Sequence, residues 1–245
     1  MEISKYKYKG NSKYDVVIDC DNYIIYEDII VKNNLLLKKD ISKKELDSLL
    51  LENLYYDCYY TAVKYLNTKM RSRKEMYHYL KKKEYSAKDI NKVLDDLEKC
   101  GYLNSVVYAR AYINDAINLR NDGPEKIKKD LLDNGIDSNI IDSELKVFDS
   151  EIINKKLDKI ISKEIRLNKD KSSFMLYQKL VTNLVNKGYS KKDITDVFNN
   201  YEIDDKSIYE SEYKKLYNKF KDKYSNGELD FKIRQKLYQK GFRNF

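Results

Sequence analysis

The sequence contains very few of the residues that form tight turns. It has one proline and seven glycines in 245 residues. Sandwiches and barrels of β-strands need a turn signal every ~8 to 12 residues, so this composition excludes them as the main architecture. Hydrophobic residues make up 42% of the chain, which is enough to build a core. We therefore expect a mainly α-helical protein.

Residues that carry chemistry are also scarce. Cys20, Cys58 and Cys100 lie far apart without CxxC spacing, so they predict neither a disulfide framework nor a zinc site. His78, the single histidine, has no acidic, Cys or His partners at metal-ligand spacing. The motifs GxxxxGK[ST], GxGxxG and GxSxG are missing. We expect a protein that is not an enzyme and needs no cofactor or metal.

Long apolar runs are missing as well. No stretch of 18 apolar residues occurs, and no apolar segment follows a basic start. This pattern predicts neither a membrane span nor a secretory signal. We expect a cytoplasmic protein.

The sequence does contain an internal repeat. The stretch "KEYSAKDINKVLDDL", which starts at Lys83, returns as "KGYSKKDITDVFNNY" from Lys187. We call the tyrosine in this stretch the anchor. It has counterparts further along the chain, at successive intervals of 51, 53 and 53 residues, and a leucine stands five residues before each anchor. The anchors are Tyr85, Ile136, Tyr189 and Phe242, the leucines Leu80, Leu131, Leu184 and Leu237, and the apolar residues nine before the anchors Met76, Ile127, Leu180 and Ile233. Such offsets mark one helix face and predict tandem helical repeats.

The repeats divide the chain into five predicted domains. Residues 1–41 contain two β-branched and aromatic runs, "YDVVID" and "NYIIYEDIIV", and predict a small N-terminal β-hairpin. Three-helix repeats are expected over 42–104, 105–150 and 151–203, with a partial fourth over 204–245. Ser42 and Ser72, each followed three residues later by glutamate, predict capping boxes. Units of about 50 residues cannot bury a core alone, so we expect them to stack into an elongated, curved helical array.

Positive charge is concentrated in the first repeat. The chain carries a net charge of +8, and Thr61 to Ile90 contains nine basic residues against three acidic ones. This excess predicts affinity for phosphate or an acidic protein groove, although a plain solvated helix face remains the alternative. The candidate partner- or DNA-binding residues are Lys69, Arg71, Arg73, Lys74, Lys81, Lys82, Lys83, Arg110, Arg120, Lys126, Lys128 and Lys129. Arg71 and Arg73 are the preferred ones because arginine makes bidentate contacts. We expect at least some of Arg71, Arg73 and Lys74 to project into solvent, and all three to be mostly dispensable for folding.

The 24 tyrosines allow two interpretations. They pack between helices with their hydroxyls at the edge of the core, or they stack on bases. No strand platform for stacking is evident in the helical part of the sequence, which favours packing.

Three stretches in order resemble a known family. They are "YLNTKMRSRKEMYHYL" from Tyr65, "LEKCGYLNSVVYARAYI" from Leu97 and "RNDGPEKIKKDLLDNGI" from Arg120. Together they resemble the RecX regulators of the bacterial RecA recombinase, which are built of tandem three-helix repeats. Where that family tends to show an acidic pair after "GYL", this chain has Asn104 and Ser105. The leading hairpin resembles an extension of some longer members.

The resemblance implies a regulator in recombination, DNA repair and the SOS response. Such a protein lies in the groove of the RecA filament on single-stranded DNA. It limits filament growth, ATPase, strand exchange and coprotease activities through protein–protein interaction. The resemblance also implies contact with the DNA, directly or through the filament, and we expect a monomer.

Two other functions remain open from the residues alone. The first is a direct nucleic-acid-binding helical repeat protein that acts without RecA, which the lysine excess favours. The absence of a recurring polar code at fixed repeat positions argues against a base-reading array. The second is a plain helical adaptor.

Overall fold

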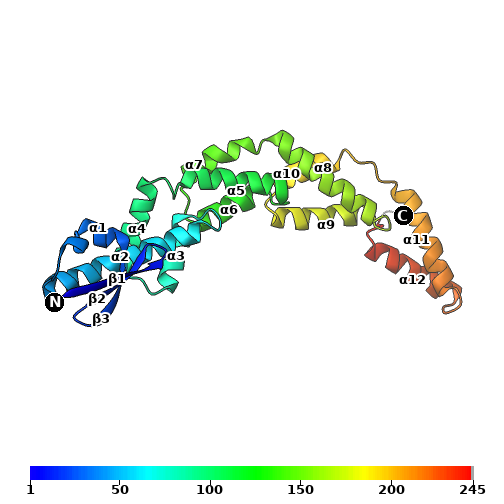
Figure 1. Ribbon diagram of the computed structural model, residues 1–245. Helices are drawn as coiled ribbons and strands as arrows, with labels where there is room; N and C mark the ends of the chain where they lie inside the picture. Colours follow the sequence, from blue (N-terminus) through cyan, green and yellow to red (C-terminus); the bar gives the residue numbers. More distant parts are fainter. Residues whose placement is uncertain (244–245) are drawn as a thin grey trace. The chain divides into compact units, whose positions relative to one another are not determined.

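The structure, a computed structural model, describes residues 1–243, with the side chain of residue 226 excepted. The chain forms two compact units. The first contains residues 1–108 together with the turn Asn134–Ile136, and the second contains the rest of the chain. Helices dominate both units (Figure 1).

The chain begins with three strands, which belong to the first unit, and continues with helices through both units. The strands are β1 (Ile3–Gly10), β2 (Lys13–Ile18) and β3 (Asp21–Tyr26). The helices are α1 (Glu27–Lys32), the 3-10 turn η1 (Leu35–Leu37), α2 (Lys43–Leu66), α3 (Arg73–Lys82), α4 (Ala87–Lys99), α5 (Ser105–Leu119), α6 (Pro124–Asp133), α7 (Ser138–Glu144), the 3-10 turn η2 (Leu145–Val147), α8 (Ser150–Leu167), α9 (Ser173–Asn186), α10 (Lys191–Phe198), α11 (Asp205–Phe220) and α12 (Asn226–Gln239).

The N-terminal strands form an antiparallel sheet in the order β1-β2-β3. The predicted hairpin is therefore present as β2 and β3, and β1 extends it by one strand. The sequence "ISKYKYKG" of β1 gave no apolar run to detect, because lysines occupy its outer positions. The second predicted strand, "NYIIYEDIIV", ends at Tyr26, because Glu27–Lys32 forms helix α1. Two acidic residues, Glu27 and Asp28, stand in the first turn of α1, where they complement the helix dipole.

The sheet packs its inner face on α1, η1 and the first half of α2. The buried residues of this core are Val16, Ile18, Ile25, Ile29, Ile30, Leu35, Ile41, Leu46 and Leu49. The side chain of Asn53 on α2 closes the outer edge of β3. Its amide oxygen accepts from the Tyr26 N–H at 3.0 Å, and its amide nitrogen donates to the Ile24 carbonyl at 2.8 Å. Pairing an edge strand in this way prevents it from recruiting another chain.

Serine caps begin several of the repeat helices. Ser42 and Ser72 both form the predicted capping boxes, in which the serine side chain accepts the N–H of a glutamate that binds back to the serine N–H. Ser172 caps α9 and Ser190 caps α10. Each cap satisfies a backbone donor that the first turn of a helix leaves free.

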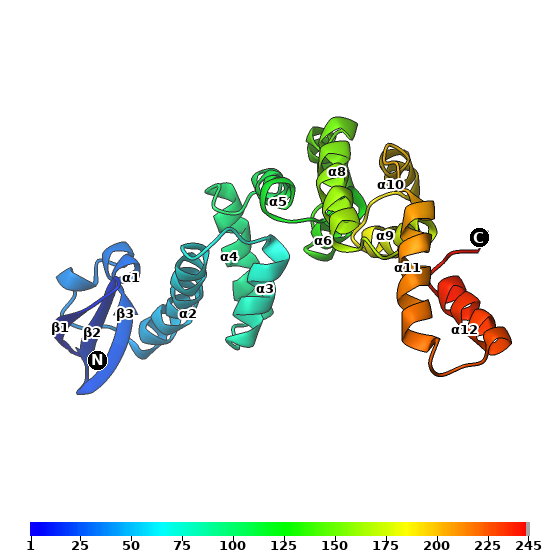
Figure 2. The ribbon, with the colours of Figure 1, turned by 90° about the vertical axis from the view of Figure 1, so that its right-hand side faces the viewer.

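The repeated apolar positions form the cores of the helical repeats. All four leucines and all four residues nine positions before the anchors are buried. The first and third repeats enclose separate clusters on α2–α4 and α8–α10, and the fourth has a smaller cluster on α11 and α12. The described part of the fourth repeat contains these two helices and no third, and they lie side by side in Figure 2. The apolar spacing thus identified the repeats.

Glycine turns join neighbouring repeats within the second unit. Gly188, with φ of +85°, leads into the anchor Tyr189, and its carbonyl accepts the Glu125 N–H of the second repeat at 3.1 Å. A Cβ at Gly188 would collide with the Lys126 backbone nitrogen. Gly241, with φ of +89°, sits in the same way on Ser172, whose hydroxyl donates to the Lys240 carbonyl at 3.0 Å. Only glycine fits such a left-handed, close-packed position.

None of the described helices is long and apolar enough to cross a membrane.

Candidate partner- and DNA-binding surface

The two arginines at the start of α3 lie inside a contact network. The Arg71 side chain is only 13% exposed, and its guanidinium stacks 4.0 Å from the centre of the Tyr65 ring. It also donates to the Thr68 hydroxyl at 3.3 Å and lies 3.7 Å from the Glu75 carboxylate. Of the three residues expected near solvent, Lys74 is exposed, whereas Arg71 is largely covered. The planar guanidinium instead covers an aromatic ring and binds the capping-box glutamate.

Arg73 is held by two carboxylates of α4. Its two terminal nitrogens donate to Asp95 at 2.7 Å and to Glu98 at 2.6 Å, so it ties α3 to α4. The two-point contact that we expected Arg73 to make with a partner is made with these two carboxylates of the same repeat. That Arg73 is mostly dispensable for folding stays a prediction, although charge reversal would place a third carboxylate beside the other two.

Four of the five candidate cations of the second repeat also bind carboxylates. Arg110 makes two contacts with Glu144, at 2.8 and 3.1 Å, and this pairing raises the pKa of Arg110. Lys128 donates to Asp142 at 2.6 Å. Arg120 and Lys126 share Asp122, at 3.7 and 2.6 Å. In the first repeat, Lys69 is 3.9 Å from Glu75 and Lys74 has a partner of its own.

Four of the twelve candidates carry no ion pair in the described part of the chain. They are Lys81, Lys82, Lys83 and Lys129. The first three follow one another at the end of α3, and all are exposed. The ammonium of Lys83 lies 6.0 Å from the centre of the Tyr79 ring, which stacks on Tyr65 at 3.7 Å. Positive charge that is available to a partner therefore gathers at the turn between α3 and α4.

This turn corresponds to the glycine turns of the later repeats. Glu84 stands one residue before the anchor Tyr85, as Gly188 stands before Tyr189. Its φ of +67° is the same left-handed conformation, which a glutamate adopts only at a cost. Glu84 is exposed, whereas Gly188 has no room for a side chain. The turn of the first repeat thus has the same backbone shape as the glycine turns that join later repeats. It carries Glu84 at the glycine position, after three lysines.

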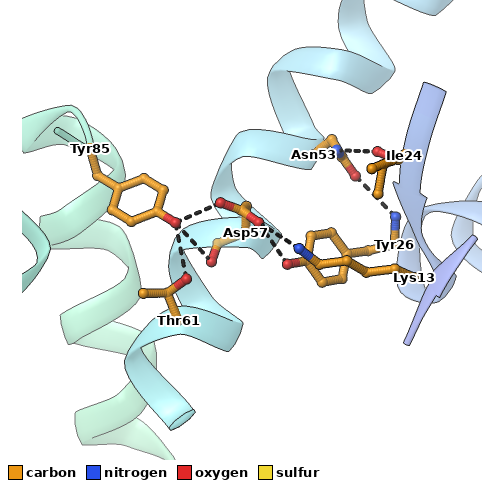
Figure 3. Close-up of polar contacts among 7 residues, drawn as sticks. All are labelled: Lys13, Ile24, Tyr26, Asn53, Asp57, Thr61 and Tyr85. Carbon is orange, nitrogen blue, oxygen red and sulfur yellow. Dashed lines mark hydrogen bonds and ion pairs between the residues drawn. The ribbon is translucent and has the colours of Figure 1, made fainter. Parts of the chain in front are cut away.

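A polar network on α2 connects this turn to the N-terminal sheet (Figure 3). Asp57 accepts hydrogen bonds from the hydroxyls of Tyr85 at 2.5 Å and Tyr26 at 2.7 Å, and from the Lys13 ammonium at 3.1 Å. Thr61 lies 3.0 Å from the same Tyr85 hydroxyl. One carboxylate therefore binds the anchor of the first repeat on one side and two strands on the other.

The same contacts keep Asp57 ionised. Burial alone would raise the pKa of its carboxyl, but the hydrogen bonds from Tyr85, Tyr26 and Lys13 outweigh burial and lower the pKa. A carboxylate that accepts several donors is stabilised in its charged form. Asp57 and Lys13 were not predicted from the sequence. An isolated acid within the aromatic run "YYDCYY" and four lysines without an acid between Ile3 and Tyr14 were the available signals.

The described residues contain no group of three or more His, Cys, Asp and Glu side chains that could hold a metal ion. Cys58 is buried, and burial raises the pKa of its thiol to about 12. A thiol of this kind is a packing residue, because only the thiolate is reactive.

Comparisons with known proteins agree on one family. The model of the RecX first three-helix domain matches residues 58–97. Regulatory protein RecX of Bacillus cytotoxicus is 30% identical over 228 residues, which span 90% of this chain and 83% of the relative. Regulatory protein RecX of Streptococcus sanguinis is 29% identical over 248 residues, with 99% and 95% covered.

Solved structures show the same fold. A crystal structure of regulatory protein RecX superposes with a TM-score of 0.68 at 23% identity and covers 80% of this chain and 98% of the other. RecX from Lactobacillus salivarius gives a TM-score of 0.57 at 24% identity, with 61% and 97% covered.

Proposed function

Since the chain belongs to the RecX family of regulatory proteins, we propose that it regulates the bacterial RecA recombinase. It binds the RecA filament on single-stranded DNA and inhibits filament growth, ATP hydrolysis, strand exchange and coprotease activity. It acts without a cofactor, as a monomer, in the cytoplasm. The observation that carries this proposal is the 30% identity to a regulatory RecX protein over 90% of the chain.

The free turn of the first repeat is the contact we assign to the filament. Lys81, Lys82 and Lys83 present three charges without carboxylate partners, at the position where later repeats bury a glycine joint. Such a cluster attracts an acidic protein surface or a phosphate backbone and accelerates encounter. Further weak contacts from other repeats add avidity, which favours an assembled filament over a free protomer.

Titration of the protein into RecA on single-stranded DNA tests this function. ATP hydrolysis should slow at substoichiometric amounts, because interruption of a filament at a few points removes many downstream subunits. A control reaction that contains the protein and single-stranded DNA but no RecA should show no ATP hydrolysis. Unchanged RecA turnover at an excess of the protein would contradict the proposal.

A second measurement separates the proposal from direct nucleic-acid binding. The protein is used to capture partners from a bacterial lysate, with and without nuclease. Capture of RecA that nuclease abolishes supports binding to the filament. General capture of nucleic acid without RecA would instead support the direct nucleic-acid-binding protein.

A further inference from the structure

A polar cleft lies in the first unit between the β1–β2 turn and the last turns of α2. Its volume is about 430 Å³, within the range of small-molecule sites. Asn11, Ser12 and Lys13 line one side, and α2 lines the other with Tyr60, Thr61, Lys64 and Asn67. Both walls belong to one compact unit, so the cleft is part of the fold.

The unpaired positive charge of the cleft is Lys64, which is exposed and has no ion pair in the described part of the chain. Lys13 also lines the cleft, but its ammonium is paired with the Asp57 carboxylate at 3.1 Å. The strand that leads to the turn adds Lys5, Lys7 and Lys9, and no acidic residue stands between Ile3 and Tyr14. Of these three, Lys9 alone is paired, with Asp15 at 3.3 Å. A polyanion is therefore the ligand that the charges favour.

The rest of the lining suits a nucleotide. Ser12 and Thr61 offer hydroxyls, and Asn11 and Asn67 offer amides, which bind phosphate and sugar oxygens. The ring of Tyr60 borders the cleft and is held in place by stacking on Tyr26 at 4.9 Å, with 6° between the ring planes. Its hydroxyl is fixed by Asp28 at 2.7 Å. A rigid aromatic ring next to cations is the combination used by proteins that bind single strands.

We infer that this cleft binds one nucleotide of single-stranded DNA, with its phosphate at Lys64 and its base or sugar against Tyr60. A single strand presents separate nucleotides that can enter a cleft of this size, whereas a duplex keeps its bases stacked. The N-terminal sheet is then a DNA-contacting module and not only a cover for the first repeat. The inference rests on the proposed function in one respect, the choice of DNA as the polyanion.

Fluorescence anisotropy with a labelled oligo-dT strand, in the absence of RecA, tests the site with the full chain. Lys64→Gln should weaken binding about fivefold or more at low salt and should lower the salt dependence by about one phosphate contact. Lys44→Gln is the matched control, since this exposed lysine of the same helix lies outside the cleft and has no ion pair in the described residues. The control should bind as the original protein does.

Three results would overturn the inference. They are failure of the original protein to bind the strand, equal binding by both variants, and tighter binding of a duplex of the same length. Melting curves should be the same for both variants, because neither lysine has an ion pair in the described residues. A Lys64→Gln protein that lacks strand binding but still slows RecA separates the two proposals. If strand binding depends on Lys64 but the protein has no effect on RecA, the result would contradict the proposed function and support the DNA site.

Discussion

The turns before Tyr85 and before Tyr189 have the same backbone shape and different surroundings. In the third repeat, Gly188 packs on Lys126, and the Tyr189 hydroxyl lies 3.4 Å from the Asp122 carbonyl of the preceding repeat. In the first repeat, Glu84 occupies the glycine position and the Tyr85 hydroxyl donates to Asp57. The difference shows that one structural element serves as a joint where a repeat precedes it and as an exposed surface where none does.

The sequence just before each turn follows this division. The first repeat has three lysines at positions 81–83, and the third has Val185, Asn186 and Lys187. A joint excludes side chains and needs glycine, while an exposed turn tolerates a strained glutamate. We therefore expect substitutions at the two turns to have opposite consequences, for stability at one and for binding at the other.

The largest effect is expected for Gly188→Ala. The new Cβ would collide with the Lys126 backbone, and the residue would keep a φ of +85°. The free energy of unfolding should fall by about 3 kcal/mol, from left-handed strain and overpacking together. Gly101→Ala is the control, because Gly101 has a φ of +76° with open space around it, and should cost about 1 kcal/mol. Urea unfolding followed by circular dichroism measures both, and equal losses would show that Gly188 is not a packed joint.

A smaller loss is expected for Asp57→Asn, which weakens the network that secures the first-repeat turn. The neutral amide cannot accept from Tyr85, Tyr26 and Lys13 together. We expect the free energy of unfolding to fall by about 1 to 2 kcal/mol at pH 7, since the carboxylate is partly exposed. Thermal melting of both proteins at pH 7 measures this difference.

The difference in stability between the original protein and Asp57→Asn should depend on pH. The lowered pKa means that Asp57 stabilises the fold above its ordinary value of 3.8, and that this contribution is lost as pH falls through the lower, folded pKa. The two proteins should therefore converge in stability toward strongly acid pH. A constant gap down to that range would contradict the network.

The smallest stability effect is expected for Glu84→Gly, and it is a gain. Glycine relieves the left-handed strain at φ of +67° and removes an exposed side chain without a packing role. The gain should be about 0.5 to 1 kcal/mol, reduced by the greater freedom of glycine in the unfolded chain. Differential scanning calorimetry detects the resulting rise in Tm. A loss of stability would show that Glu84 has a structural contact.

Much of the fold was predictable because apolar spacing reports buried helix faces directly. Leu80, Leu131, Leu184 and Leu237 are all at most 1% exposed, and the Ser42 and Ser72 capping boxes are confirmed. Strand β1 was not predictable, because its edge position lets lysines replace the alternating apolar residues on which strand detection depends.

The candidate surface was less accessible to sequence reasoning. Charge counts do not reveal partners, and the acids that bind Arg73 lie more than 20 residues away, on the next helix. The arginines chosen for their bidentate geometry are occupied, and the lysine run that was the weaker candidate is free. Long-range pairing of this kind becomes visible only when the helices are placed side by side.

Affinity for RecA filaments measured over a salt series tests the role of the free turn most directly. Labelled protein is titrated with filaments on single-stranded DNA, and Lys81→Gln with Lys82→Gln is compared with Lys43→Gln with Lys44→Gln on the first turns of α2. All four lysines are exposed and without ion pairs in the described residues, so both double variants should melt as the original protein does. We predict about tenfold weaker binding for the turn variant alone at low salt, narrowing as salt rises. Equal affinity of the two variants would contradict the assignment of the turn between α3 and α4 as the filament-binding surface.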